Sequence, residues 1–117
     1  MIEHRNIILT GNLRAIDFFY YAQIYAIRNN INGFIQNGNK SHVYLEVEGE
    51  AEDLDKFEKE LTQKPLGHYV DAKEVQKGVL RDFHNFHVYY KRIKEQAKPN
   101  RKWVKKIAAF FNGLIPF

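Results

Sequence analysis

The chain has 117 residues, which is the length of one domain with a modest hydrophobic core. Its composition is 44% hydrophobic and 27% charged with a net charge of +4, as in an ordinary globular protein. The absence of cysteine excludes disulfides and thiolate metal sites, and no apolar run approaches the roughly 20 residues of a membrane-spanning helix. Because the N-terminus also lacks a signal-peptide pattern, we expect a cytoplasmic protein.

The first predicted elements are a strand and a helix. Residues 4–10 alternate in the manner of a strand, with Ile7 and Leu9 on one face. Residues 15–30 have the length and composition of a helix. This helix is expected to end at Asn29-Asn30, because asparagine tolerates the left-handed conformation that often follows a helix.

A hairpin is predicted next. Residues 33–37 and 41–48 are strand-like and flank Asn37-Gly38-Asn39-Lys40, a strong turn signal. In the second strand, Val43, Leu45 and Val47 alternate with polar residues and tyrosine. The pattern predicts that these three side chains face the core.

The second half of the chain predicts one helix and two strands. Residues 51–63 form an amphipathic pattern with acidic residues in the first turn, and Pro65 follows the helix. Residues 70–80 and 85–90 are the remaining strand candidates, of which 85–90 alternates more clearly.

The order β-α-β-β-α-β predicts an α+β fold, the ferredoxin-like sandwich. In this fold an antiparallel sheet of four main strands carries the helices 15–30 and 51–63 on one face. We expect residues 1–90 to form this domain and residues 91–117 to be a C-terminal extension. The predicted core contains Ile7, Leu9, Leu45, Val47, Leu54, Phe57 and Val88.

The region between the first two predicted strands carries the most specific pattern. Thr10-Gly11 opens a loop, Phe18 lies within it, Ala26 lies in the helix, and Gly33-Phe34-Ile35-Gln36-Asn37 forms the next strand. In this order and without a gap, these residues resemble the signature region of acylphosphatases. The resemblance covers about residues 5–90 and implies the same ferredoxin-like architecture.

The resemblance also implies a catalytic apparatus. In acylphosphatases the backbone N–H groups of a glycine-rich loop bind the phosphate, an arginine neutralises its charge, and a strand asparagine positions the attacking water. Asn37 stands at the asparagine position. Ala15 and Asp17 occupy two glycine positions of the loop, and Phe19 occupies the position of the arginine. The loop equivalent consists of Asn12, Leu13, Arg14, Ala15, Ile16, Asp17, Phe18 and Phe19.

These replacements predict a degenerate phosphate cradle. Asp17 places a negative charge where the phosphate would bind, and Phe19 cannot form a bidentate charge pair. We therefore expect a domain without catalytic competence that acts as a binding or assembly module. The alternative is an atypical acylphosphatase in which Asn37 acts with a substitute arginine, Arg14 or, farther along the helix, Arg28. Asn37 equally fits a structural role in the hairpin turn.

The first helix has more apolar residues than one face requires. Phe18, Ala22, Tyr25 and Ala26 can form the stripe against the sheet. The surplus residues are Phe19, Tyr20, Ile24 and Ile27. This excess predicts a second packing surface, covered by the C-terminal extension or by another copy of the chain.

The C-terminal extension is strongly basic. Residues 91–117 carry eight Lys or Arg and one acidic residue, a net charge of +7. Residues 1–90 carry ten Lys or Arg and thirteen acidic residues, a net charge of −3. Residues 101–112 predict a basic amphipathic helix that includes Trp103. We expect this helix to dock on the chain's own domain or on a second copy, giving a homo-oligomer. Contact with a membrane surface is the alternative.

Other functions find less support in the sequence. Ferredoxin-like sheets can stack nucleic-acid bases on aromatic residues such as Tyr44, His87 and Tyr89, but the domain body is acidic and we do not expect nucleic-acid binding. No cofactor is predicted, and no metal, because His84 and His87 would face opposite sides of a strand. The natural small-molecule ligand is not indicated.

Overall fold

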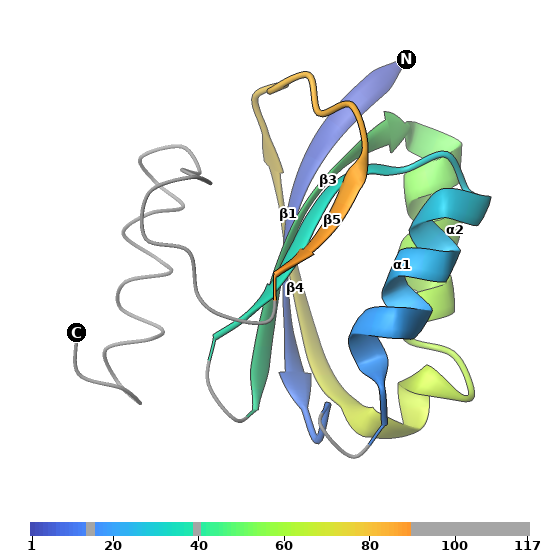
Figure 1. Ribbon diagram of the computed structural model, residues 1–117, viewed down its shortest axis with the longest axis vertical. Coiled ribbons are helices and arrows are strands. Elements are labelled where there is room, and N and C mark those ends of the chain that lie inside the picture. The colour runs from blue at the N-terminus through green and yellow to red at the C-terminus, as the bar shows by residue number, and fades with distance from the viewer. Residues whose placement is uncertain (14–15, 39–40, 90–117) are drawn as a thin grey trace.

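The computed structural model describes residues 1–13, 16–38 and 41–89, which form a sheet with two α-helices packed on one of its faces (Figure 1). The predicted extension 91–117, with its helix 101–112 and Trp103, lies outside the described residues, as do Arg14 and Ala15 of the loop. The elements are β1 (Ile2–Gly11), α1 (Phe18–Arg28), β2 (Asn32–Asn37), β3 (His42–Glu50), α2 (Ala51–Leu61), the short 3-10 helix η1 (Leu66–Tyr69), β4 (Val70–Gly78) and β5 (Phe86–Tyr89).

The described strands form a five-stranded sheet in the order β4-β1-β3-β2-β5. β1 pairs antiparallel with β3 and β4, and β2 pairs antiparallel with β3. This arrangement confirms the predicted ferredoxin-like fold. The sheet is nevertheless mixed, because β5 adds to the edge of β2 in parallel. Alternation within a strand identifies its faces but not its direction, so the sequence did not predict the parallel pair.

The core lies between the sheet and the two helices. Ile7, Leu9, Leu45, Val47, Leu54 and Phe57 are all fully buried there, as predicted. Val88 is only partly buried against this core, because it belongs to the edge strand β5. The register is therefore the predicted one.

Both ends of α1 are defined by local capping contacts. The helix begins at Phe18 rather than at residue 15, because Asp17 is its N-cap and accepts a hydrogen bond from the backbone N–H of Tyr20 at 3.3 Å. At the other end Asn30 has φ +59°, and Ile31 N donates to Ala26 O at 2.8 Å. These contacts form a Schellman motif, which confirms the predicted helix end.

The second helix is attached to the sheet by charged side chains. Arg5 Nη1 on β1 lies 2.7 Å from both Asp55 Oδ1 and Glu58 Oε2 on α2. Lys73 Nζ on β4 lies 3.0 Å from Glu58 Oε1. The apolar residues of α2 face the sheet and the ion pairs connect its margin to β1 and β4.

The outer surface of α1 retains two of the surplus apolar residues. Tyr20 is 54% exposed and Ile27 is 64% exposed, whereas Phe19 packs partly against the core. The prediction of an apolar surplus is thus confirmed for Tyr20 and Ile27. Within the described part of the chain, no helix has the length and apolar character needed to cross a membrane.

Candidate functional site

The residues that match the family motif gather at one end of the sheet. β1 and β2 run in the same direction because each is antiparallel to β3. Gly11 and Asn37, the last residues of these two strands, therefore lie at the same end of the sheet. The loop from β1 to α1 begins at this end (Figure 1). The topology therefore brings the loop and the predicted catalytic asparagine to the same region of the molecule.

Gly11 fixes the entrance to the loop. Its φ is +155°, and a Cβ built on it would lie 2.1 Å from the backbone oxygen of Tyr69. Its N–H donates to Ser41 O at 2.9 Å, and the β1–β4 register shifts between Thr10 and Gly11. Only glycine fits this close approach of two backbone segments. This supports the alignment of Thr10-Gly11 with the start of the family loop.

The described end of the loop places a carboxylate and two aromatic side chains at the start of α1. The carboxylate of Asp17 lies at the N-terminus of α1, where backbone N–H groups and the helix dipole would otherwise favour an external anion. Phe18 is buried in the core, and Phe19 packs partly against the same core. The position at which the sequence analysis expects the family arginine therefore carries an aromatic ring that packs partly against the core.

Asn37 keeps one unsatisfied polar atom. Its Oδ1 is buried and has no hydrogen-bond partner among the described residues. The neighbouring Gly38 N–H donates to His42 O at 3.0 Å, which continues the hairpin. Burial lowers the pKa of His42 below its ordinary value, so this imidazole is neutral near pH 7.

Arg28 does not reach the loop. It lies in the last turn of α1, about 16 Å along the helix axis from the loop end. Its Nη2 forms a 2.5 Å ion pair with Glu60 Oε2 on α2, and its guanidinium lies 4.8 Å from the centre of the Tyr25 ring. The hypothesis that Arg28 replaces the missing arginine is therefore wrong. Arg14, the other proposed substitute, is not among the described residues.

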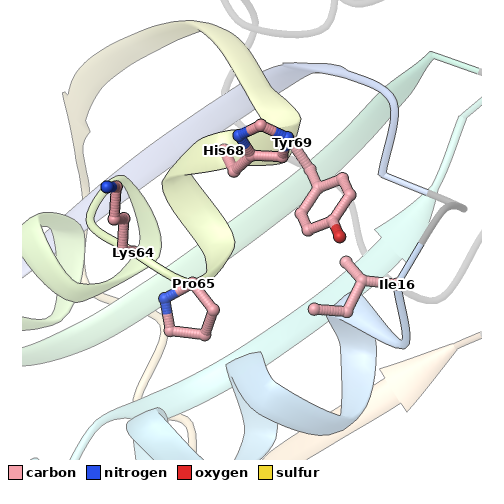
Figure 2. A pocket seen from close by; sticks show the side chains of 5 residues that line it. All are labelled: Ile16, Lys64, Pro65, His68 and Tyr69. Carbon is pink, nitrogen blue, oxygen red and sulfur yellow. The ribbon is translucent and has the colours of Figure 1, made fainter.

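A shallow pocket of ≈ 300 Å³ lies between the loop and the segment before β4. Figure 2 shows Tyr69 directed towards Ile16 across this hollow, with Pro65 on the side of Lys64 and His68. Lys64 and His68 are exposed at its rim. The pocket is open and mainly apolar, and the described residues that line it include no buried side chain that donates hydrogen bonds.

The opposite face of the sheet holds a polar cluster that the sequence analysis missed. His4 Nδ1 lies 2.7 Å from Glu48 Oε2, and its Nε2 lies 3.2 Å from Glu46 Oε1 and 2.9 Å from Asn6 Oδ1. Arg81 Nη1 lies 3.0 Å from Glu46 Oε1. The signal was present as His4 and Glu48 on the polar sides of two strands, but only the β1–β3 register makes them neighbours.

This face is not an open platform for nucleic-acid bases. Tyr44 lies on it as predicted, but it is 1% exposed and its hydroxyl donates to Glu46 Oε2 at 2.6 Å. His87 and Tyr89 are stacked on each other at the edge, with ring centres 5.7 Å apart. The two buried carboxylates beneath this face, Glu46 and Glu48, are paired with His4 and Arg81. Within the described ranges no group of three His, Asp or Glu side chains is arranged to hold a metal ion.

Comparisons with known proteins identify the family. A family model described as acylphosphatase matches residues 5–88, more than half of the chain. The chain belongs to the acylphosphatase family. An acylphosphatase from Archaeoglobus fulgidus is 30% identical over 84 residues, which cover 72% of this chain and 94% of that protein. The predicted family resemblance is confirmed.

Solved structures show the same fold. The crystal structure of acylphosphatase from Bacillus subtilis superimposes with a TM-score of 0.67 at 24% identity, covering 77% of this chain and 100% of that one. Full-length HypF in its phosphate- and nucleotide-bound form gives a TM-score of 0.73 at 20% identity. This match covers 92% of this acylphosphatase-family chain and 15% of HypF. The acylphosphatase fold thus also occurs as a small part of a longer chain.

Proposed function

We propose that this acylphosphatase-family domain has a degenerate phosphate cradle and acts as a binding or assembly module rather than as a hydrolase. The observation that carries the proposal is the position of Asp17. Its carboxylate accepts a hydrogen bond from Tyr20 N–H at the N-terminus of α1, where an acyl phosphate would need the same kind of donor.

The electrostatics at this position oppose the family reaction. An acyl phosphate is a dianion, and its transition state requires converging N–H donors and a cation. Asp17 repels the dianion, and the neutral ring of Phe19 packs partly against the core. Losing one charge-assisted contact of this kind raises the barrier by about 3–4 kcal/mol, or two to three decades of rate.

Two observations support a role in binding or assembly. Tyr20 and Ile27 expose apolar surface on the outer side of α1, which suits contact with another protein segment. The same fold is a small part of full-length HypF, which is in keeping with use as a module. The predicted partner is the chain's own extension 91–117 or a second copy.

The alternative function is an atypical acylphosphatase that uses Asn37 with Arg14. The unsatisfied buried Oδ1 of Asn37 favours it, because an amide that positions water needs a free polar atom. Asn37 ends β2 at the edge of the sheet from which the loop starts, so a guanidinium on that loop would complete the pair of groups.

Hydrolysis of acetyl phosphate by the full-length chain tests these two functions directly, with the Bacillus subtilis acylphosphatase as positive control. We expect a rate near the uncatalysed background, unchanged by Asn37→Ala or Arg14→Ala. Turnover well above background that is lost in both variants would establish the atypical enzyme and refute the module without catalysis. A control variant, Arg28→Ala, should leave the rate unchanged in either case, because this side chain pairs with Glu60 far from the loop.

A further inference from the structure

The segment 79–85, here called the strap, connects the two edges of the sheet. β4 and β5 are four strand spacings apart in the sheet order, which is about 19 Å. The chain from Gly78 to Phe86 can extend over at most about 27 Å. The strap therefore has little slack, and it runs from β4 to β5 at the upper end of Figure 1. Its contacts are with the face of the sheet opposite to the helices.

Glu48 is the main attachment point of the strap. Its carboxylate accepts hydrogen bonds from the backbone N–H groups of Arg81 at 2.5 Å and of Phe83 at 3.1 Å. The Phe83 ring stacks on His4 with ring centres 5.9 Å apart and contacts Phe34 edge-on at 5.8 Å. The strap is thus held by two backbone hydrogen bonds and two ring contacts, to residues of β1, β2 and β3.

The charges beneath the strap balance only when His4 is protonated. Glu46 and Glu48 are 0% and 4% exposed, and the cations that contact them are Arg81 and, when protonated, His4. Loss of the His4 proton leaves two carboxylates against one guanidinium in a buried site. An uncompensated buried charge is strongly unfavourable, and opening of the strap would admit water to it.

Among residues 1–13, 16–38 and 41–89, no ion pair of His4 is formed with a group other than Glu46 and Glu48. On β4, His4 lies opposite Gly78, and the uncharged Gln76 lies two residues before Gly78. On its own strand, His4 contacts the side-chain amide of Asn6. The phenol of Tyr44 donates a hydrogen bond to Glu46. Other charged groups on these elements are farther off: Glu74 lies opposite Ile8, and Asp82 and His84 are exposed on the strap.

We propose that protonation of His4 locks the strap onto the sheet, and that loss of this proton releases it. The strap is therefore a pH-responsive cover of the sheet face opposite to the helices. Release uncovers the aromatic surface formed by Phe34 and Tyr44, which makes the second face of the sheet available for contact. This device is separate from the proposed function at the loop, because none of its residues belongs to the loop or to the end of β2.

The direction of the pH response follows from the contacts. Burial by itself opposes the charged imidazole, but the hydrogen bonds to Glu46, Glu48 and Asn6 outweigh it and raise the pKa of His4 above 6.5. A raised pKa in the closed state means that closure is most favourable below pH 6.5. The closing equilibrium then falls by up to tenfold per pH unit until the pH passes the raised pKa.

Amide hydrogen exchange of the full-length chain, followed by NMR between about pH 6 and 9, tests the strap directly. The protection factors of the Arg81 and Phe83 amides should be lower than those of β3 amides and should fall by up to tenfold per pH unit above pH 6.5. In His4→Gln they should be low and independent of pH. His84→Gln is the matched control, because it removes an exposed imidazole from the same strap, and it should behave as wild type.

Three results would overturn the proposal. The first is protection of Arg81 and Phe83 that does not change with pH, or that keeps its wild-type slope in His4→Gln. The second is equal protection of strap and β3 amides at every pH, which would mean that only the whole domain opens. The third needs no variant: NMR titration of the His4 ring in wild type should give a pKa above 6.5, and a value at or below 6.5 would remove the basis of the lock.

Discussion

At the scale of single residues, Asp17 and Phe19 both contribute to the folded structure of the domain. Asp17 caps α1 and Phe19 contributes to the core, so each side chain has a structural role at a position where the family binds phosphate. Replacing either residue with the one that the family motif would place there then removes a stabilising contact. A gain of function at this loop should therefore be accompanied by a loss of stability.

This reasoning predicts the behaviour of the double variant Asp17→Gly, Phe19→Arg. It should bind inorganic phosphate where wild type does not, because the repelling carboxylate is removed and a guanidinium is added. The loss of the N-cap should lower the free energy of unfolding by a few tenths of a kcal/mol, and the loss of the partly buried ring by about 1 kcal/mol or more. Calorimetric titration and urea denaturation measure the two effects.

The matched control is Asp17→Gly with Tyr20→Arg, which adds the same charge on the exposed side of the helix. Phosphate binding by both variants would mean that net charge alone attracts the anion. Binding by neither would show that the loop no longer follows the family path.

At the scale of elements, the C-terminal end of α1 sets the direction in which the chain enters β2. Asn30 adopts φ +59° and directs the chain from the helix into β2, while Ile31 packs into the core immediately afterwards. Residues other than glycine and asparagine are strained in this conformation. The position of β2 in the sheet therefore depends on one backbone conformation.

Substitutions of Asn30 should separate backbone strain from side-chain contacts. Asn30→Val should lower the free energy of unfolding by about 1–2 kcal/mol, because a β-branched residue is disfavoured at positive φ. Asn30→Gly should leave stability unchanged or slightly higher. Thermal denaturation of the two variants measures the difference, and equal stabilities would show that the conformation of residue 30 does not limit the fold.

At the scale of the whole molecule, the charged clusters should lower the free energy of unfolding both at acid and at alkaline pH. The pKa of Glu48 is lowered because the hydrogen bonds from Arg81, His4 and Phe83 outweigh the opposing effect of burial. Its contribution is complete above pH 4.5 and is lost as the pH falls through the lowered pKa. His42, whose pKa burial lowers, also withdraws stability on the acid side below pH 6.5.

The loss of stability at alkaline pH is due to His4. Its stabilising contribution is complete below pH 6.5 and is lost as the pH rises through its raised pKa. We therefore predict that the free energy of unfolding, measured with urea, is greatest near about pH 6.5 and declines as the pH rises above it through the raised pKa of His4. Below pH 8 the N-terminal amine, whose pKa is raised above 8.0 by Glu50, does not contribute to this decline.

Two variants assign the decline to its residue. His4→Gln should abolish the alkaline decline, whereas His42→Gln should keep it and reduce the loss on the acid side. A decline of unchanged slope in His4→Gln would assign it to another group and contradict the prediction.

The sequence by itself determined the order of the elements and which face of each strand and helix is buried. Alternation in residues 41–48 and the apolar stripe of residues 51–63 depend on local geometry, namely the two-residue repeat of a strand and the 3.6-residue repeat of a helix. The same holds for the end of α1, because the preference of asparagine for positive φ is a property of one residue. The loop motif and the family assignment were also readable, since they depend on the order of residues along the chain.

Only the tertiary structure decided which polar residues act together. His4 and Glu48 are 44 positions apart, and Arg81 lies on a segment whose path over the sheet no local pattern specifies. The cluster exists because β1 and β3 are paired in one register and because β5 returns to the far edge of the sheet. Likewise, Arg28 became a partner of Glu60 through packing between two helices that are distant in sequence. Contacts of this kind depend on where the chain meets itself, which local preferences do not encode.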